Sequence, residues 1–158
     1  LKLASGCCPV QKLADAGVNV ALGTDGVASN NDLDLFGEMR SAALLGKIVA
    51  ADAAALPAQD VLAMATLNGA RALGRDDTIG SLVPGKEADI TAVDLGVIES
   101  QPVYDPVSQL VYSTGRNQVT NVWVAGRQLL HERNLLTLER DSIRSRLDAW
   151  REKLKVNA

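Results

Sequence analysis

An aspartate that follows an apolar segment is the residue of this sequence best suited to chemistry. Residues 18–24 (VNVALGT) lead directly to Asp25, and Gly26 follows it. Carboxylates at the C-terminal ends of parallel strands lie where α/β barrels carry their active sites. Such a carboxylate can bind a divalent cation or accept a proton. The alternative is an aspartate that turns the chain or caps the next helix.

A polar loop, residues 26–32 (GVASNND), comes directly after this aspartate. Small and hydrogen-bonding side chains are typical of turns, and the same side chains suit contact with a polar ligand. We predict Ser29 and Asn30 as substrate-binding residues. Hydrogen bonds from both side chains to the backbone of their own loop are the alternative, and the sequence leaves the two roles open.

Composition and charge indicate an ordinary globular domain. Of the 158 residues, 47% are apolar and 22% are charged, which is typical of such proteins. The net charge of −3 argues against a nucleic-acid-binding surface, which needs clustered positive charge. The apolar runs fall well short of the ~20 residues that a membrane span needs. We therefore expect neither nucleic acid nor a membrane as a partner.

The two cysteines, Cys7 and Cys8, are adjacent in the sequence. Neighbouring cysteines rarely form a disulfide, and two thiols without the CxxC spacing do not form a zinc knuckle. We expect a cytoplasmic protein in which both thiols stay reduced and pack in the core as small apolar groups.

Hydrophobic periodicity predicts a helical block followed by a β-rich block. A single strand cannot bury itself, so a strand at residues 18–24 needs neighbouring strands. A (β/α)8 barrel takes ~250 residues, and this chain begins at Leu1 without an initiator Met. We therefore expect a fragment of a larger protein. The predicted elements are helices at 8–17, 33–51, 58–73 and 139–155, strands at 18–24, 90–93, 119–124 and 128–131, and a hairpin turn at 125–126.

Three motifs of this chain resemble the amidohydrolase superfamily, and the resemblance covers almost the whole sequence. They are residues 23–26 (GTDG) with 29–32 (SNND), residues 64–74 (MATLNGARALG) and residues 79–89 (IGSLVPGKEAD). Within the superfamily, the 5-methylthioadenosine/S-adenosylhomocysteine deaminases are the group that this chain resembles most. That closer likeness lies in residues 3–6 (LASG), 23–34 and 105–108 (DPVS).

The resemblance implies an α/β fold in three parts. Residues 1–76 would be the C-terminal end of a metal-dependent (β/α)8 barrel with its closing helices. Residues 77–138 would be part of a small β-sandwich beside the barrel, and residues 139–158 a C-terminal helix.

The resemblance also implies a site. The family holds one divalent metal ion, expected to be zinc, and the aspartate that matches Asp25 is both a metal ligand and a catalytic proton carrier. The implied substrate is a purine nucleoside whose adenine becomes a hypoxanthine-type base while ammonia leaves. Histidines supply the other metal ligands in the family, but the single histidine here, His131, matches no ligand position and is expected to have a structural or surface role.

Three further expectations complete this interpretation. The isolated chain would be inactive and would hold no tightly bound metal, and the full-length protein could form a homo-oligomer. The alternatives are another amidohydrolase, such as a guanine or cytosine deaminase or a chlorotriazine hydrolase, and a non-catalytic stand-alone module.

Overall fold

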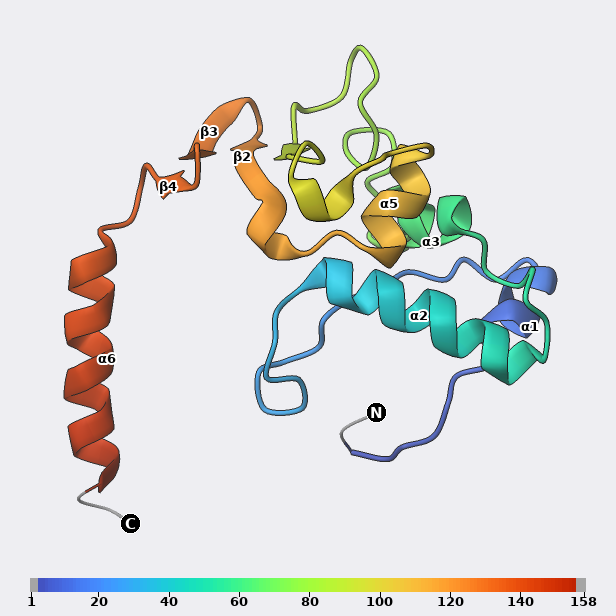
Figure 1. Ribbon diagram of the computed structural model, residues 1–158, viewed down its shortest axis with the longest axis horizontal. Helices are drawn as coiled ribbons and strands as arrows, with labels where there is room; N and C mark the ends of the chain where they lie inside the picture. The colour runs from blue at the N-terminus through green and yellow to red at the C-terminus, as the bar shows by residue number, and fades with distance from the viewer. Residues whose placement is uncertain (1–2, 156–158) are drawn as a thin grey trace.

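The chain forms a helical block, a small antiparallel sheet and a long final helix, and one helix of the block lies between the first two strands in the sequence (Figure 1). The computed structural model describes residues 3–155; residues 1–2 and 156–158, at the two ends of the predicted segments 1–76 and 139–158, lie outside this range. The helices are α1 (Val10–Asp15), α2 (Leu35–Ala50), α3 (Ala58–Met64), α4 (Leu67–Ala72), α5 (Pro106–Tyr112) and α6 (Arg140–Lys155), with 3₁₀ turns η1 (Ile98–Ser100) and η2 (Arg116–Gln118). The strands are β1 (Ile90–Val93), β2 (Val119–Val124), β3 (Arg127–His131) and β4 (Asn134–Leu135).

The prediction of one continuous helix at 58–73 is wrong, because two short helices, α3 and α4, take its place. The break lies at Thr66, whose φ of −131° and ψ of −95° are far from helical values. The Thr66 hydroxyl donates to the Leu62 carbonyl at 2.7 Å. A threonine side chain offers the backbone this alternative to helical hydrogen bonding, so the helix stops and restarts.

The segment 18–24, predicted as a strand, has no strand partner among residues 3–155 and forms no strand there. It is extended, and its burial alternates. Val20, Leu22 and Thr24 are half-buried, whereas Ala21 and Asp25 are exposed. One face of the segment therefore packs on the helical block while the opposite face stays open, as expected for a strand without its neighbours.

Helix α5 was not predicted, although its first residues carry a clear start signal. The Asp105 carboxylate caps the helix by accepting hydrogen bonds from the backbone N–H groups of Val107 and Ser108, and Pro106 occupies the first turn. An N-cap aspartate followed by proline is a common helix start. The helix matters for the fold because Val111 completes the buried cluster described below.

The sheet confirms the predicted β-rich block and has the order β1-β2-β3-β4, antiparallel throughout. Ala125 and Gly126 turn the chain between β2 and β3 with φ values of 48° and 76°, which is the positive-φ geometry that a tight hairpin requires. The Asp89 carboxylate accepts a hydrogen bond of 2.7 Å from the Ala125 N–H and so ties this turn to the start of β1.

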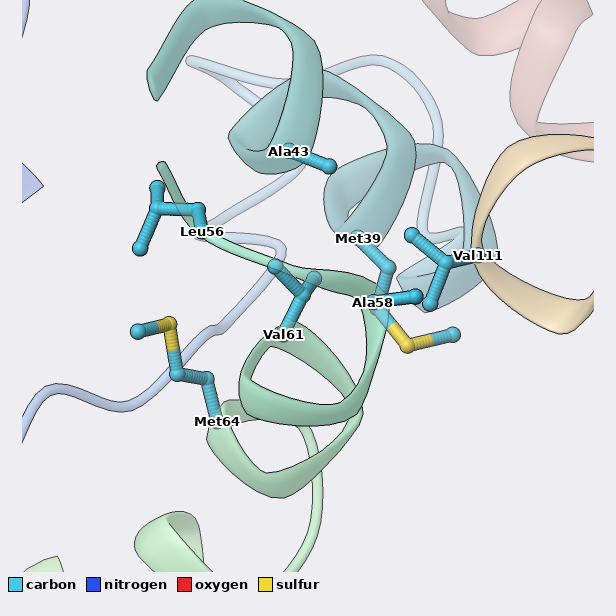
Figure 2. Close-up of a cluster of buried hydrophobic side chains, with 7 residues drawn as sticks. All are labelled: Met39, Ala43, Leu56, Ala58, Val61, Met64 and Val111. Carbon is cyan, nitrogen blue, oxygen red and sulfur yellow. The ribbon is translucent and has the colours of Figure 1, made fainter. Parts of the chain in front are cut away.

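The core lies between α2, α3 and α5 rather than under the sheet (Figure 2). Gly46 of α2 permits close packing here, because a Cβ at this position would lie 2.1 Å from Leu56 Cδ1. Leu56 is only 1% exposed as a result. The buried cluster consists of Met39, Ala43, Leu56, Ala58, Val61, Met64 and Val111.

Two surface features complete the description. Cys7 and Cys8 are exposed free thiols, so the prediction that they pack in the core is wrong; the chain before α1 runs along the surface, away from the cluster.

Helix α6 stands apart from the helical block, and none of its residues is buried (Figure 1). Among residues 3–155, no helix has both the length and the hydropathy of a membrane span.

Candidate functional site

Asp25 lies where the extended segment ends and the chain turns. Its backbone has a φ of 61°, in the left-handed region that aspartate tolerates better than most residues. The N–H groups of Ser29 and Asn30 both donate to the Gly26 carbonyl, at 3.1 and 2.9 Å. This turn folds the loop back over the aspartate, so residues four positions apart meet.

The short helices α3 and α4 hold the extended segment that carries Asp25. The Leu22 N–H donates to the Met64 carbonyl at 2.9 Å. The Asn68 side chain donates to the Val20 carbonyl at 3.0 Å, and the Asn19 side chain donates to the Asn68 carbonyl at the same distance. Met64 and Asn68 belong to the second motif of the sequence, which therefore positions the first.

Two hydrogen bonds hold the Asp25 carboxylate. The Gly26 N–H donates to Oδ1 at 2.7 Å, and the Ser29 hydroxyl donates to Oδ2 at 2.5 Å. The Ser29 hydrogen bond, followed by that of Gly26, lowers the pKa of Asp25 below its ordinary value of 3.8. The side chain is exposed and ionised at neutral pH. Because each carboxylate oxygen has about two acceptor positions, both oxygens keep capacity for another partner.

The loop residues predicted to bind substrate have different surroundings. Ser29 contacts Asp25, as described. Asn30 points the other way: its side-chain N–H donates to Glu38 Oε1 of α2 at 2.6 Å, and its Oδ1 accepts from the Asp32 N–H at 3.1 Å. The structure thus brings Ser29, but not Asn30, to the aspartate. Contact of either residue with a substrate stays a prediction.

A distant arginine anchors the same loop and was missed by the sequence analysis. Arg116 of η2 forms an ion pair with Asp32, and Asp34 caps α2 by accepting from the Phe36 N–H at 3.0 Å. The capping aspartate could have been found from its position before the helix. The Asp32–Arg116 pair could not, since 84 positions separate the two residues and Arg116 lies outside the motifs of the sequence.

A separate cavity of about 650 Å³ lies between the helical block and β1. Its lining is mostly apolar and includes Phe36, Met39 and Leu62 from the helices and Ile90 and Val93 from the strand. The three predicted site residues do not line it. The cavity is therefore distinct from the surroundings of Asp25.

The described residues supply one candidate metal ligand at this site, Asp25. Across residues 3–155, no group of three or more His, Cys, Asp or Glu side chains is placed to hold a metal ion. His131 is an exposed residue of the sheet, with Nδ1 3.2 Å from Asn121 Oδ1 and 3.1 Å from Gln128 Nε2, in agreement with its expected structural or surface role. An ionised carboxylate with free acceptor positions fits a single ligand position of a divalent cation, and a full tetrahedral set needs three more donors.

Comparison with known proteins gives the family. Residues 1–129 match the amidohydrolase family model. The chain is 58% identical over 154 residues to a 5-methylthioadenosine/S-adenosylhomocysteine deaminase of Teredinibacter turnerae, an alignment that covers 98% of this chain and 35% of that protein. This chain therefore spans about a third of the length of the relatives it matches.

Solved structures agree in fold. An adenosine deaminase from Xanthomonas campestris with bound zinc superposes with a TM-score of 0.95 and 51% identity, covering 98% of this chain and 35% of that one. An atrazine chlorohydrolase from Arthrobacter aurescens, complexed with zinc, superposes with a TM-score of 0.82 and 32% identity, covering 91% of this chain and 32% of that one. The motifs, the fold and the match of the family model to residues 1–129 agree, and the chain belongs to the amidohydrolase family.

Proposed function

We propose that the full-length protein that contains this chain is a zinc-dependent hydrolytic deaminase. Its substrates would be adenosines with a modified 5′ position, such as methylthioadenosine and S-adenosylhomocysteine. The single observation that carries the proposal is the Asp25 carboxylate, held by two hydrogen bonds and open on its other side, in a chain that superposes on a zinc-containing deaminase over 98% of its length. The higher identity to the deaminases than to the chlorohydrolase favours deamination.

The proposed architecture explains why one face of the extended segment is open. Residues 1–76 would complete a (β/α)8 barrel, with residues 18–24 as its last strand. Val20 and Leu22 pack toward the helices, so Ala21 and Asp25 would face the barrel interior once neighbouring strands are present. Residues 77–138 would form part of the adjoining β-sandwich, and residues 139–158 the terminal helix.

Asp25 would supply one oxygen ligand to the metal, and the other ligands would come from parts of the full-length protein outside this chain. A bound divalent cation lowers the pKa of its water to about 7. The acceptor position that remains on the Asp25 carboxylate would take the proton of the attacking water and deliver it to the departing amino nitrogen. Oxygen would then replace nitrogen at C6 of the adenine, the second proton of the water would end on ring N1, ammonia would leave, and a hypoxanthine-type base would remain. The loop that carries Ser29 and Asn30 would border the substrate.

Two further parts of the proposal concern the setting of the enzyme. The unpaired thiols of Cys7 and Cys8 favour the reducing cytoplasm as its compartment. A homo-oligomer is also proposed, and light scattering on the full-length protein would measure its mass directly.

The test uses the purified full-length protein. Zinc content is measured, ammonia release is followed with methylthioadenosine, S-adenosylhomocysteine and guanine, and chloride release is followed with a chlorotriazine. We expect stoichiometric zinc and the highest kcat/KM with the two adenosines. Asp25→Asn should lower kcat/KM by about 10²–10⁴-fold, the range of general acid–base catalysis, whereas the exposed control Asp77→Asn should leave it unchanged.

Three other results would each contradict one part of the proposed function. Preference for guanine or the triazine would assign the protein to another amidohydrolase activity. Absence of zinc together with absence of ammonia and chloride release would favour a non-catalytic module, and full activity of Asp25→Asn would remove Asp25 from the mechanism.

A further inference from the structure

The hydroxyl of Ser29 is set by its turn to face Asp25. The hydrogen bonds from the Ser29 and Asn30 N–H groups to the Gly26 carbonyl close the turn and return the chain to the aspartate. Ser29 itself is half-buried. The backbone, rather than a chance rotamer of a long side chain, therefore brings the hydroxyl to the carboxylate.

The single hydroxyl proton of Ser29 has two acceptors within reach. Asp25 Oδ2 lies 2.5 Å from Oγ, and the Gly26 carbonyl lies 3.1 Å from it. An ionised carboxylate is the stronger acceptor, and short distances are typical of hydrogen bonds from a hydroxyl to a charged oxygen. The proton therefore goes to Asp25.

Ser29 and Gly26 together fix the plane of the carboxylate, because they bind different oxygens of it. No ion pair of the described residues includes Asp25. Asn30 is occupied by Glu38 and by the Asp32 N–H, so it does not share this task. The free acceptor positions of both oxygens are then held in one orientation.

We infer that Ser29 is a positioning residue, which acts on the metal and the reacting atoms through the Asp25 carboxylate rather than by touching the substrate. The inference rests on the proposed function, since it needs Asp25 to be a metal ligand. Ligating carboxylates generally depend on hydrogen bonds from the surrounding protein, and loss of such a partner costs about 10–100-fold in metal affinity or activity. Ser29 is the one side chain of the described residues that hydrogen-bonds to this carboxylate.

The chain offers a matched control elsewhere. The Ser108 hydroxyl donates to Asp105 Oδ2 at 2.6 Å, the same kind of contact at the start of α5. A serine-to-alanine change there removes an equivalent hydrogen bond without touching Asp25.

The experiment uses the full-length holoenzyme with Ser29→Ala, Ser29→Thr, Ser29→Cys, Ser108→Ala and Asp25→Asn. Zinc affinity is measured by chelator competition, the metal environment by the visible spectrum of the cobalt(II)-loaded protein, and kcat and KM with methylthioadenosine. We expect Ser29→Ala to weaken zinc binding by about 10–100-fold, to change the cobalt spectrum and to lower kcat with KM unchanged. Ser29→Thr, which keeps a hydroxyl, should keep most of the zinc affinity and most of kcat. Ser108→Ala should alter neither the zinc affinity nor kcat.

Other results overturn the inference. A higher KM in Ser29→Ala with normal zinc affinity and spectrum would make Ser29 a substrate contact instead, and normal values throughout would give it no role at the site. If Ser29→Ala does not fold, Ser29→Cys, of similar size but a weaker donor, takes its place with the same expected direction. Normal zinc affinity and activity in Asp25→Asn would instead refute the proposed function. Failure of the inference about Ser29 can therefore be told apart from failure of the proposed function.

Discussion

The side-chain amide of Asn68 donates to the backbone carbonyl of Val20 at 3.0 Å, and the side-chain amide of Asn19 donates to the backbone carbonyl of Asn68 at the same distance. These two hydrogen bonds join α4 to the segment that ends at Asp25. With the 2.9 Å bond from the Leu22 N–H to the Met64 carbonyl, they give the extended segment backbone partners although no strand of the described chain pairs with it. The placement of Asp25 thus depends on helices that follow it by about forty residues.

Asn68→Ala should lower the free energy of unfolding by about 1 kcal/mol, because the Val20 carbonyl loses its side-chain donor. Urea titrations of the purified protein measure the change. Gln59→Ala, at an exposed position of α3, is the control and should stay within about 0.5 kcal/mol of the parent. Equal stability of the two variants would mean that the Asn68 amide contributes nothing to holding the segment.

Gly80→Ala should destabilise the protein more than Gly85→Ala. Both glycines have positive φ, 87° and 96°, so alanine is strained at either position by about 1–2 kcal/mol. A Cβ at Gly80 would also lie 2.6 Å from Ala70 Cβ and 3.1 Å from the Leu67 Cα, whereas a Cβ at Gly85 would meet nothing within 4 Å. Thermal or urea unfolding should give an additional cost of about 1–3 kcal/mol at Gly80. Equal costs would show that backbone strain alone accounts for both.

Gly46 and Leu56 should behave as a coupled pair. Gly46→Ala places a methyl group against the buried Leu56 side chain, which we expect to cost about 1–3 kcal/mol. Leu56→Ala leaves a cavity in the core at a cost of about 2–5 kcal/mol. In the double variant the added methyl group meets no leucine side chain. The loss of stability in the double variant should therefore be smaller than the sum of the losses in the two single variants. A double-mutant cycle by urea unfolding measures this difference, and strict additivity would contradict the contact.

Asp105 should make stability depend on pH in the acid range. The Ser108 hydroxyl, followed by the Val107 N–H, lowers the pKa of this capping carboxyl below 3.8. A carboxyl with a depressed folded-state pKa contributes stability above its unfolded pKa and loses that contribution as the pH falls through the folded value. The stability difference between the parent and Asp105→Asn should therefore be largest above pH ~4 and shrink below it. A difference that stays constant from pH 6 to pH 2.5 would contradict this assignment.

The sequence by itself determined the local elements and the family. Helix α2, helix α6, the strands β1 to β3 and the hairpin at Ala125-Gly126 follow from periodicity and turn residues within a few positions of one another. The three motifs likewise identified the amidohydrolase family, since motifs are read directly from adjacent residues. Asp25 stood out for the same reason, because a carboxylate after an apolar run is a local pattern.

Only the tertiary structure decided how these parts meet. It set residues 18–24 against α3 and α4, and no strand within residues 3–155 pairs with them, since a strand exists only where a neighbour supplies hydrogen-bond partners. It paired Asp32 with Arg116 across 84 positions, and it turned Ser29 toward Asp25 while directing Asn30 to Glu38. Periodicity and propensity describe neighbours along the chain, whereas these contacts arise from packing between distant segments and from the exact course of one turn.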